Sequence, residues 1–134
     1  MESSRYVIDF DNINDILQEV VDIGYKFQIE TRFNSDDESI NHIDISIWKR
    51  PGYIYTDEII DTVGRLVDFL RRGGWEMTNK SKSILKSFSE IPHIEKGESD
   101  YKTIRVGSME TFDIEWIDGK WGIWNDLKLE FYTP

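Results

Sequence analysis

The sequence predicts an α+β fold: an antiparallel sheet, made of a meander plus a C-terminal hairpin, packed by two helices. Two segments carry apolar residues at helical spacing, and several others alternate apolar and polar residues as half-buried strands do. A chain of 134 residues fits a single domain, residues 1–134. Residues 76–134 form a possible sub-lobe, because the pattern is least regular over residues 75–100.

The first predicted helix begins at Asp11, whose side chain can cap its N-terminus. Its apolar residues have the i, i+3, i+4, i+7 spacing of one helix face: Ile13, Ile16, Leu17 and Val20. Gly24 ends the helix, and residues 25–30 then alternate apolar and polar side chains with the period of a strand. Residues 34–39 are expected to form a loop.

A second strand is predicted over residues 43–47, where isoleucines alternate with polar residues. The turn "RPGY" closes it, and residues 53–55 are expected to form a short third strand. Three consecutive strands of this kind predict a meander.

The second predicted helix is capped by Thr56 or Asp57 and ends at Gly73-Gly74. Its apolar stripe is the most regular in the chain: Ile59, Ile60, Val63, Leu66, Val67 and Leu70. Residues 80–88 are expected to form a short helix, and residues 90–100 a loop, since Pro92 and Gly97 interrupt any period.

The clearest hairpin lies near the C-terminus. Asp118-Gly119 favours a two-residue type I′ turn, which sets Trp116 opposite Trp121 and Ile114 opposite Ile123. Such aromatic pairs across strands stabilise one register. A final strand is predicted over residues 127–131.

Charge is the strongest functional signal in the sequence. The chain carries a net charge of −10, and residues 1–47 hold eleven acidic residues against three basic ones. Such a surface disfavours direct binding of nucleic acid or anionic lipid and favours a basic partner. The basic cluster in residues 71–86 leaves a local phosphate contact possible, which ranks below protein binding. The acidity could also serve solubility alone.

The residues predict no enzyme, no metal and no cofactor. Phosphate-binding and nucleophile-elbow motifs are missing, and the chain has no cysteine. Neither His42 nor His93 has metal-ligand spacing, and residues 36–38 lack the glycine and spacing of a calcium loop. Asp113 and Glu115 share one face of a strand, so a paired acid and base remains conceivable.

We expect a cytoplasmic protein without a membrane partner. The N-terminal segment lacks the basic and apolar regions of a signal peptide, and no apolar run approaches the roughly 20 residues of a membrane span. The missing cysteines suit a reducing compartment. The oligomeric state is left open.

Residues 12–75 resemble a known family. The segment NIND at residues 12–15 opens the first helix, Tyr25 follows thirteen residues after Asn12, and the second helix closes in Gly74-Trp75. With the order helix, three strands, helix, these features resemble small phage-encoded anti-CRISPR proteins that block the type II RNA-guided nuclease. The chain departs from that family after Trp75, where residues 79–86 are basic and an additional β region follows.

The resemblance implies that acidic side chains imitate DNA phosphates in a cleft of the target. The positions that it implies are Asp22, Asp36, Asp37, Glu38 and Asp44. We therefore expect a non-enzymatic, phage-type inhibitor that occupies a basic, nucleic-acid-binding surface of a host defence or nucleic-acid-processing protein. Trp48 and Trp124 are expected opposite the core face, and exposed tryptophans often anchor interfaces.

The predicted partner-binding residues share an acidic or aromatic side chain on the first helix, the following loop or the second strand: Asp15, Glu19, Asp22, Asp36, Asp37, Glu38, Asp44 and Trp48. Two other functions remain open. One is a structural or assembly subunit, of a virion or a homo-oligomer, whose tryptophan-rich hairpin packs against copies of itself. The other is an immunity protein that neutralises a basic nuclease toxin.

Overall fold

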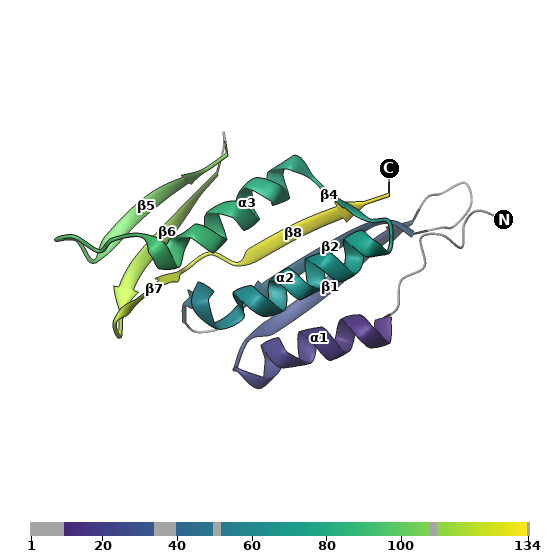
Figure 1. Ribbon diagram of the computed structural model, residues 1–134, viewed down its shortest axis with the longest axis horizontal. Coiled ribbons are helices and arrows are strands. Elements are labelled where there is room, and N and C mark those ends of the chain that lie inside the picture. The colour runs from purple at the N-terminus through teal and green to yellow at the C-terminus, as the bar shows by residue number, and fades with distance from the viewer. Residues whose placement is uncertain (1–9, 34–39, 50–51, 108–109, 134) are drawn as a thin grey trace.

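The computed structural model describes residues 10–33, 40–49, 52–107 and 110–133 (Figure 1). Within them it confirms the α+β class, with helices and two antiparallel sheets. The helices are α1 (Phe10–Asp22), α2 (Thr56–Arg72) and α3 (Asn79–Glu90), followed by a 3-10 turn at Ile91–His93. The strands are β1 (Lys26–Phe33), β2 (Ile40–Trp48), β3 (Ile54–Tyr55), β4 (Glu76–Met77), β5 (Tyr101–Val106), β6 (Glu110–Ile117), β7 (Lys120–Ile123) and β8 (Leu127–Tyr132).

Two four-stranded sheets organise the chain. Sheet A has the order β1-β2-β8-β4, and sheet B has the order β3-β7-β6-β5. The last strand, β8, therefore lies between β2 and β4, in the middle of a sheet that starts at residue 26. Residues 76–134 thus complete the sheet that the N-terminal half begins, and buried side chains of both halves belong to one apolar cluster.

The expected three-stranded meander is wrong at its third strand. Residues 54–55 pair with β7 in sheet B, and the neighbour of β2 in sheet A is β8. The reason is that β8 offers β2 a longer run of apolar partners than β3 does. Six residue pairs join β2 to β8 and bring Leu127, Leu129 and Phe131 level with the isoleucines of β2, whereas β3 has two residues and runs directly into α2.

Helices α1 and α2 cover one face of sheet A, as Figure 1 shows, and bury the two apolar stripes that the sequence predicts. The helix α3 lies along β8 instead. Thr78 caps α3 by accepting the Ser81 backbone N–H at 3.2 Å, and the Ser81 hydroxyl accepts the Glu130 backbone N–H at 2.8 Å. The short helix expected near residues 80–88 is confirmed. It follows the two-residue strand β4 and continues beside β8 where β4 ends.

The predicted hairpin is confirmed in its turn and in its register. Asp118 and Gly119 both have positive φ, 55° and 83°, as a type I′ turn requires. Trp116 faces Trp121, and their rings meet edge to face at a centroid distance of 5.1 Å. Ile114 likewise faces Ile123.

A polar network joins sheet B to α2 and to Tyr25, the residue that precedes β1. Lys120 donates to one oxygen of Glu58 at 2.8 Å, and the Tyr25 hydroxyl donates to the other at 2.8 Å while accepting the Tyr55 backbone N–H at 3.0 Å. Burial alone would raise the pKa of Glu58, but the hydrogen bonds from Lys120 and Tyr25 outweigh it and hold that pKa below its ordinary value. Burial raises the pKa of Tyr25. At neutral pH, Glu58 is therefore an ionised carboxylate and Tyr25 a neutral phenol.

No helix in the described part of the chain is long and apolar enough to cross a membrane.

Two glycines are expected to respond to alanine with opposite signs. A Cβ at Gly122 would lie 2.5 Å from Tyr53 Cβ, whereas a Cβ at Gly64, inside α2, would meet nothing within 4 Å. We expect Gly122→Ala to lower the free energy of unfolding by about 1–3 kcal/mol. Gly64→Ala should raise it by about 0.5–1 kcal/mol. Urea unfolding followed by circular dichroism measures both, and equal effects at the two positions would contradict the packing of Tyr53 on β7.

Candidate partner-binding groove

The open face of sheet A, opposite α1 and α2, carries the polar side chains of its strands. Alternate residues of a strand point to opposite faces, and the buried isoleucines of β2 point toward the helices. The remaining residues of β1, β2 and β8 therefore share the open face: Lys26, Gln28, Glu30, Arg32, His42, Asp44, Ser46, Trp48, Lys128, Glu130 and Tyr132.

Three carboxylates form a row across this face. Glu30 on β1 is the register partner of Asp44 on β2, and Asp44 is the register partner of Glu130 on β8. Directly opposed side chains have Cβ atoms about 5 Å apart, so like charges at these positions destabilise the sheet. The fold therefore tolerates a repulsive arrangement that any neutral side chain would relieve.

The row lies in a groove of about 810 Å³. Its floor is the open face of β1, β2 and β8, and its walls come from α3, the start of β6 and the turn before β8. The charged lining residues are the carboxylates Glu30, Asp44, Glu110, Asp126 and Glu130 and the lysines Lys80 and Lys128. Five carboxylates against two lysines give the groove a balance of −3.

Among the described residues, Lys80 and Arg32 lie close to two of these carboxylates, Glu110 and Asp44. Lys80 pairs with Glu110 at 2.8 Å, and this ion pair raises the pKa of Lys80. Arg32 lies 3.7 Å from Asp44 Oδ2, while the buried Oδ1 atom accepts no hydrogen bond from a described residue. No ion pair joins Glu30 to a lysine or arginine in the described ranges, and Gln28 donates to Glu30 at 2.8 Å. The centre of the row is thus only weakly compensated.

The structure divides the predicted partner-binding residues. Asp44 and the half-buried Trp48 line the groove. Asp15 and Asp22 are exposed on α1, which covers the other face of the same sheet, so one flat partner surface cannot contact both groups. The predicted residues lie on two faces of sheet A because α1 packs on the isoleucine face of β2, opposite Asp44. Asp36, Asp37 and Glu38 lie outside the described residues.

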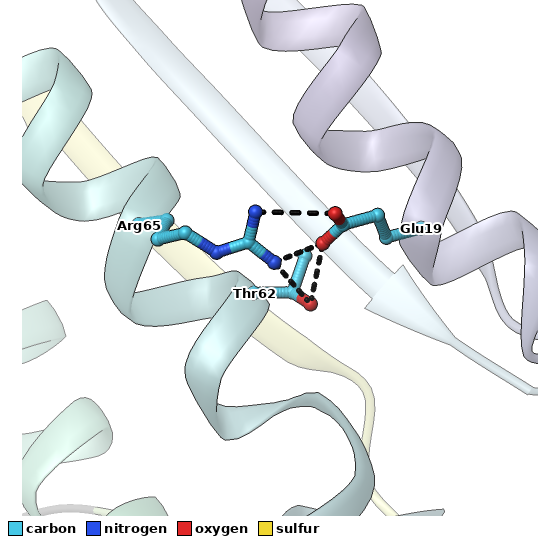
Figure 2. Close-up of polar contacts among 3 residues, drawn as sticks. All are labelled: Glu19, Thr62 and Arg65. Carbon is cyan, nitrogen blue, oxygen red and sulfur yellow. Dashed lines mark hydrogen bonds and ion pairs between the residues drawn. The ribbon is translucent and has the colours of Figure 1, made fainter.

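Glu19, another predicted partner-binding residue, makes an ion pair within the molecule. Figure 2 shows its carboxylate facing Arg65 and Thr62 of α2. Arg65 Nη1 donates to Oε1 at 3.1 Å, Arg65 Nη2 donates to Oε2, and the Thr62 hydroxyl donates to Oε2 at 3.2 Å. The hydrogen bond from Arg65 is the main cause that lowers the pKa of Glu19, and the same pair raises the pKa of Arg65. The charge of Glu19 therefore links α1 to α2.

The sequence did not identify the other acids of the groove. The strand patterns at residues 25–30 and 127–131 place Glu30 and Glu130 on polar faces, which is the one available signal. Their adjacency to Asp44 depends on the register between β2 and β8, which lie about eighty residues apart in the sequence.

The negative charge of the groove favours cationic groups in general. In the described ranges, no group of three His, Asp or Glu side chains is arranged to hold a metal ion. His42 lies on the open face beside Asn41, with Nδ1 3.4 Å from Oδ1, and His93 is exposed in the 3-10 turn.

Comparisons of the chain with protein-family models, with curated proteins and with solved structures found no match.

The ion pair of Glu19 predicts a pH-dependent stability. Because Arg65 lowers its folded pKa, the ionised carboxylate stabilises the fold above its ordinary pKa, and this contribution is lost as the pH falls through the folded value. We expect Glu19→Gln to lower the free energy of unfolding at neutral pH and to lower it less at acid pH, as the carboxylate of the parent protein becomes protonated. Urea titrations at both pH values measure the difference.

The matched control is Asp15→Asn, an exposed acid one turn away on α1. It should show a much smaller difference between the two pH values. A penalty for Glu19→Gln that stayed constant down to acid pH would mean that the side chain acts through packing and not through its charge.

Proposed function

We propose that this protein is a non-enzymatic, acidic binding protein. The carboxylates that line its groove bind a basic, nucleic-acid-binding surface of another protein. The observation that carries the proposal is the row Glu30, Asp44 and Glu130, set across three strands inside a groove of net negative charge. Repulsive rows of this kind cost stability, and a use in binding accounts for that cost.

The row supports imitation of a phosphate backbone. Neighbouring strands lie about 4.8 Å apart, so a row across three strands presents regularly spaced negative charges. A protein that binds nucleic acid offers lysine and arginine side chains to successive phosphates. Such side chains can pair with carboxylates in the same way, and arginine does so with two parallel hydrogen bonds.

Trp48 supplies an apolar anchor beside the row. It lines the groove on β2, four residues after Asp44, and is half-buried. Interfaces combine a few aromatic anchors with a polar rim, and tryptophan is among the residues that contribute most to binding energy. The groove thus has both components of a partner surface.

The proposed partner is a host defence or nucleic-acid-processing protein, and the proposed role is that of a phage-type inhibitor. The resemblance of residues 12–75 to small anti-CRISPR proteins suggests this role. The electrostatics of the groove would equally suit an immunity protein for a basic nuclease toxin, so the identity of the partner separates the two.

The homo-oligomeric alternative receives less support from the hairpin. Trp121 is buried in the core, and Trp116 packs against the same apolar cluster. Of the tryptophans in the hairpin and the turn after it, Trp124 is the exposed one. Trp116 and Trp121 of this hairpin therefore serve the fold of the monomer.

Partner capture tests the proposal. The immobilised protein is exposed to a bacterial lysate, captured proteins are identified by mass spectrometry, and the affinity for each is measured with the purified partner. We expect the captured proteins to be nucleic-acid-binding proteins. Short double-stranded DNA should displace them from the immobilised protein. Affinity should fall by at least roughly tenfold between about 0.05 and 0.5 M salt, because exposed charges are screened.

Two triple variants with equal charge change locate the contact. Glu30→Gln/Asp44→Asn/Glu130→Gln should weaken binding by roughly tenfold or more, whereas Asp11→Asn/Asp15→Asn/Asp22→Asn on α1 should change it by less than about threefold. Equal losses in both variants would show that only net charge matters. Full binding by the groove variant would refute the proposal.

A further inference from the structure

The outer face of sheet B carries a second cluster, separate from the groove. The inner face of this sheet buries Phe112, Ile114, Trp121 and Ile123 in the core. The opposite face places four aromatic side chains around two carboxylates: Tyr53, Tyr55, Tyr101 and Trp124 around Asp113 and Glu115. We call these six residues the aromatic platform.

The strand register builds the platform. Tyr101, Glu115, Gly122 and Tyr55 are successive register partners across the four strands, so they form one row. Gly122 leaves the space that Tyr53 and Tyr55 fill, since a Cβ there would approach both rings. The ring centroids of Tyr53 and Trp124 lie 3.9 Å apart.

Large aromatic surfaces of the platform face solvent. Tyr101 is 51% exposed and Trp124 is 50% exposed, the two most exposed of the large apolar side chains in the described ranges. Trp124 is nevertheless held in place. Its backbone N–H donates to the Asp113 carbonyl at 3.3 Å, and the next residue, Asn125, accepts the Asp113 backbone N–H at 3.1 Å. The exposed ring is therefore fixed before any partner binds.

The carboxylates of the platform are also fixed, and they lack a cation. Tyr53 donates to Glu115 Oε2 at 2.9 Å and the Trp124 indole donates to the same oxygen at 3.1 Å, while Thr103 donates to Asp113 at 3.1 Å. In the described ranges no lysine or arginine forms an ion pair with either acid. Within the described part of the chain, the platform therefore has two negative charges among its rings that no lysine or arginine pairs with.

One edge of the platform already holds a cation of the protein itself. The Lys120 ammonium lies 4.5 Å from the centroid of the Tyr55 ring and pairs with Glu58 at 2.8 Å. A ring face next to a carboxylate is thus a combination that this fold uses for an internal lysine. The central part of the platform repeats the combination with Trp124 and Glu115, where the ring is exposed and no internal cation is present among the described residues.

We propose that the aromatic platform binds an arginine side chain of a protein partner. The guanidinium group stacks on the exposed ring of Trp124 and donates to Glu115, with Asp113 adding negative potential. A planar guanidinium stacks on aromatic rings and forms directed hydrogen bonds to a carboxylate at the same time, which an ammonium group does less well. This site lies on sheet B and does not require the groove to bind anything.

The test uses the indole N–H of Trp124 as a reporter in ¹H–¹⁵N spectra. The probe is the capped tripeptide Gly-Arg-Gly, and its control is the same peptide with citrulline, the uncharged analogue of arginine. Arginine should shift the Trp124 signal saturably, with citrulline at least about tenfold weaker and lysine weaker than arginine. The Trp124→Phe variant assigns the signal by removing it.

Variants separate this site from the groove. Glu115→Gln should weaken arginine binding by about fivefold or more, and Trp124→Ala should abolish it. Glu130→Gln, a groove change of equal charge, should leave it unaltered. The four other indole signals report whether each variant is folded, and the other signals of sheet B take over as reporters in Trp124→Ala.

Equal shifts with citrulline, or unchanged arginine binding by Glu115→Gln, would overturn the inference. So would arginine-induced shifts confined to the groove or α1. Because the groove variants are measured on a captured partner and the platform variants on a peptide, either proposal can fail without the other.

Discussion

The pairing of β8 with β2 is the constraint on which the rest of the structure depends. It places the last strand of the chain at the centre of sheet A and buries its three apolar residues against the isoleucines of β2. The same register sets Glu130 level with Asp44, which completes the carboxylate row. Because a short turn joins β7 to β8, it also brings sheet B beside the open face, where the start of β6 forms a wall of the groove. One set of backbone hydrogen bonds thus builds the core and the candidate site together.

The acidic side chains on the two sides of sheet A differ in how closely cations pair with them. On the helix side, Glu19 is neutralised by Arg65 and holds α1 to α2, and Glu58 is neutralised by Lys120 and holds the hairpin to α2. On the open side, the row is only partly compensated by Arg32, at 3.7 Å from Asp44. On the platform of sheet B, no described lysine or arginine forms an ion pair with Asp113 or Glu115. Net charge alone therefore does not show which carboxylates lack a nearby cation, whereas the positions of Arg65, Lys120 and Arg32 do.

Local patterns in the sequence predicted the helices, the hairpin turn and the Trp116–Trp121 pair, because spacing and turn chemistry act between near neighbours. The exposure of Trp124 opposite the core face was predicted in the same way. The division into two sheets was not, since the choice between β3 and β8 as the neighbour of β2 depends on a match between distant segments. The groove could not be predicted for the same reason. Alternation showed that Glu30 and Glu130 are polar-face residues, but only the tertiary register shows that they flank Asp44.

The most direct test of this account is a cross-link in a chain that has no native cysteine. Ser46 and Lys128 are register partners of β2 and β8, so Ser46→Cys/Lys128→Cys should form an intramolecular disulfide on mild oxidation, measured as the loss of both free thiols in the monomer. Gln28→Cys/Lys128→Cys, on the same face but one strand further apart, should not, because about 10 Å between Cα atoms exceeds the reach of a disulfide. A disulfide in the second variant but not in the first would mean that β8 does not pair with β2, and the row and its groove would not exist.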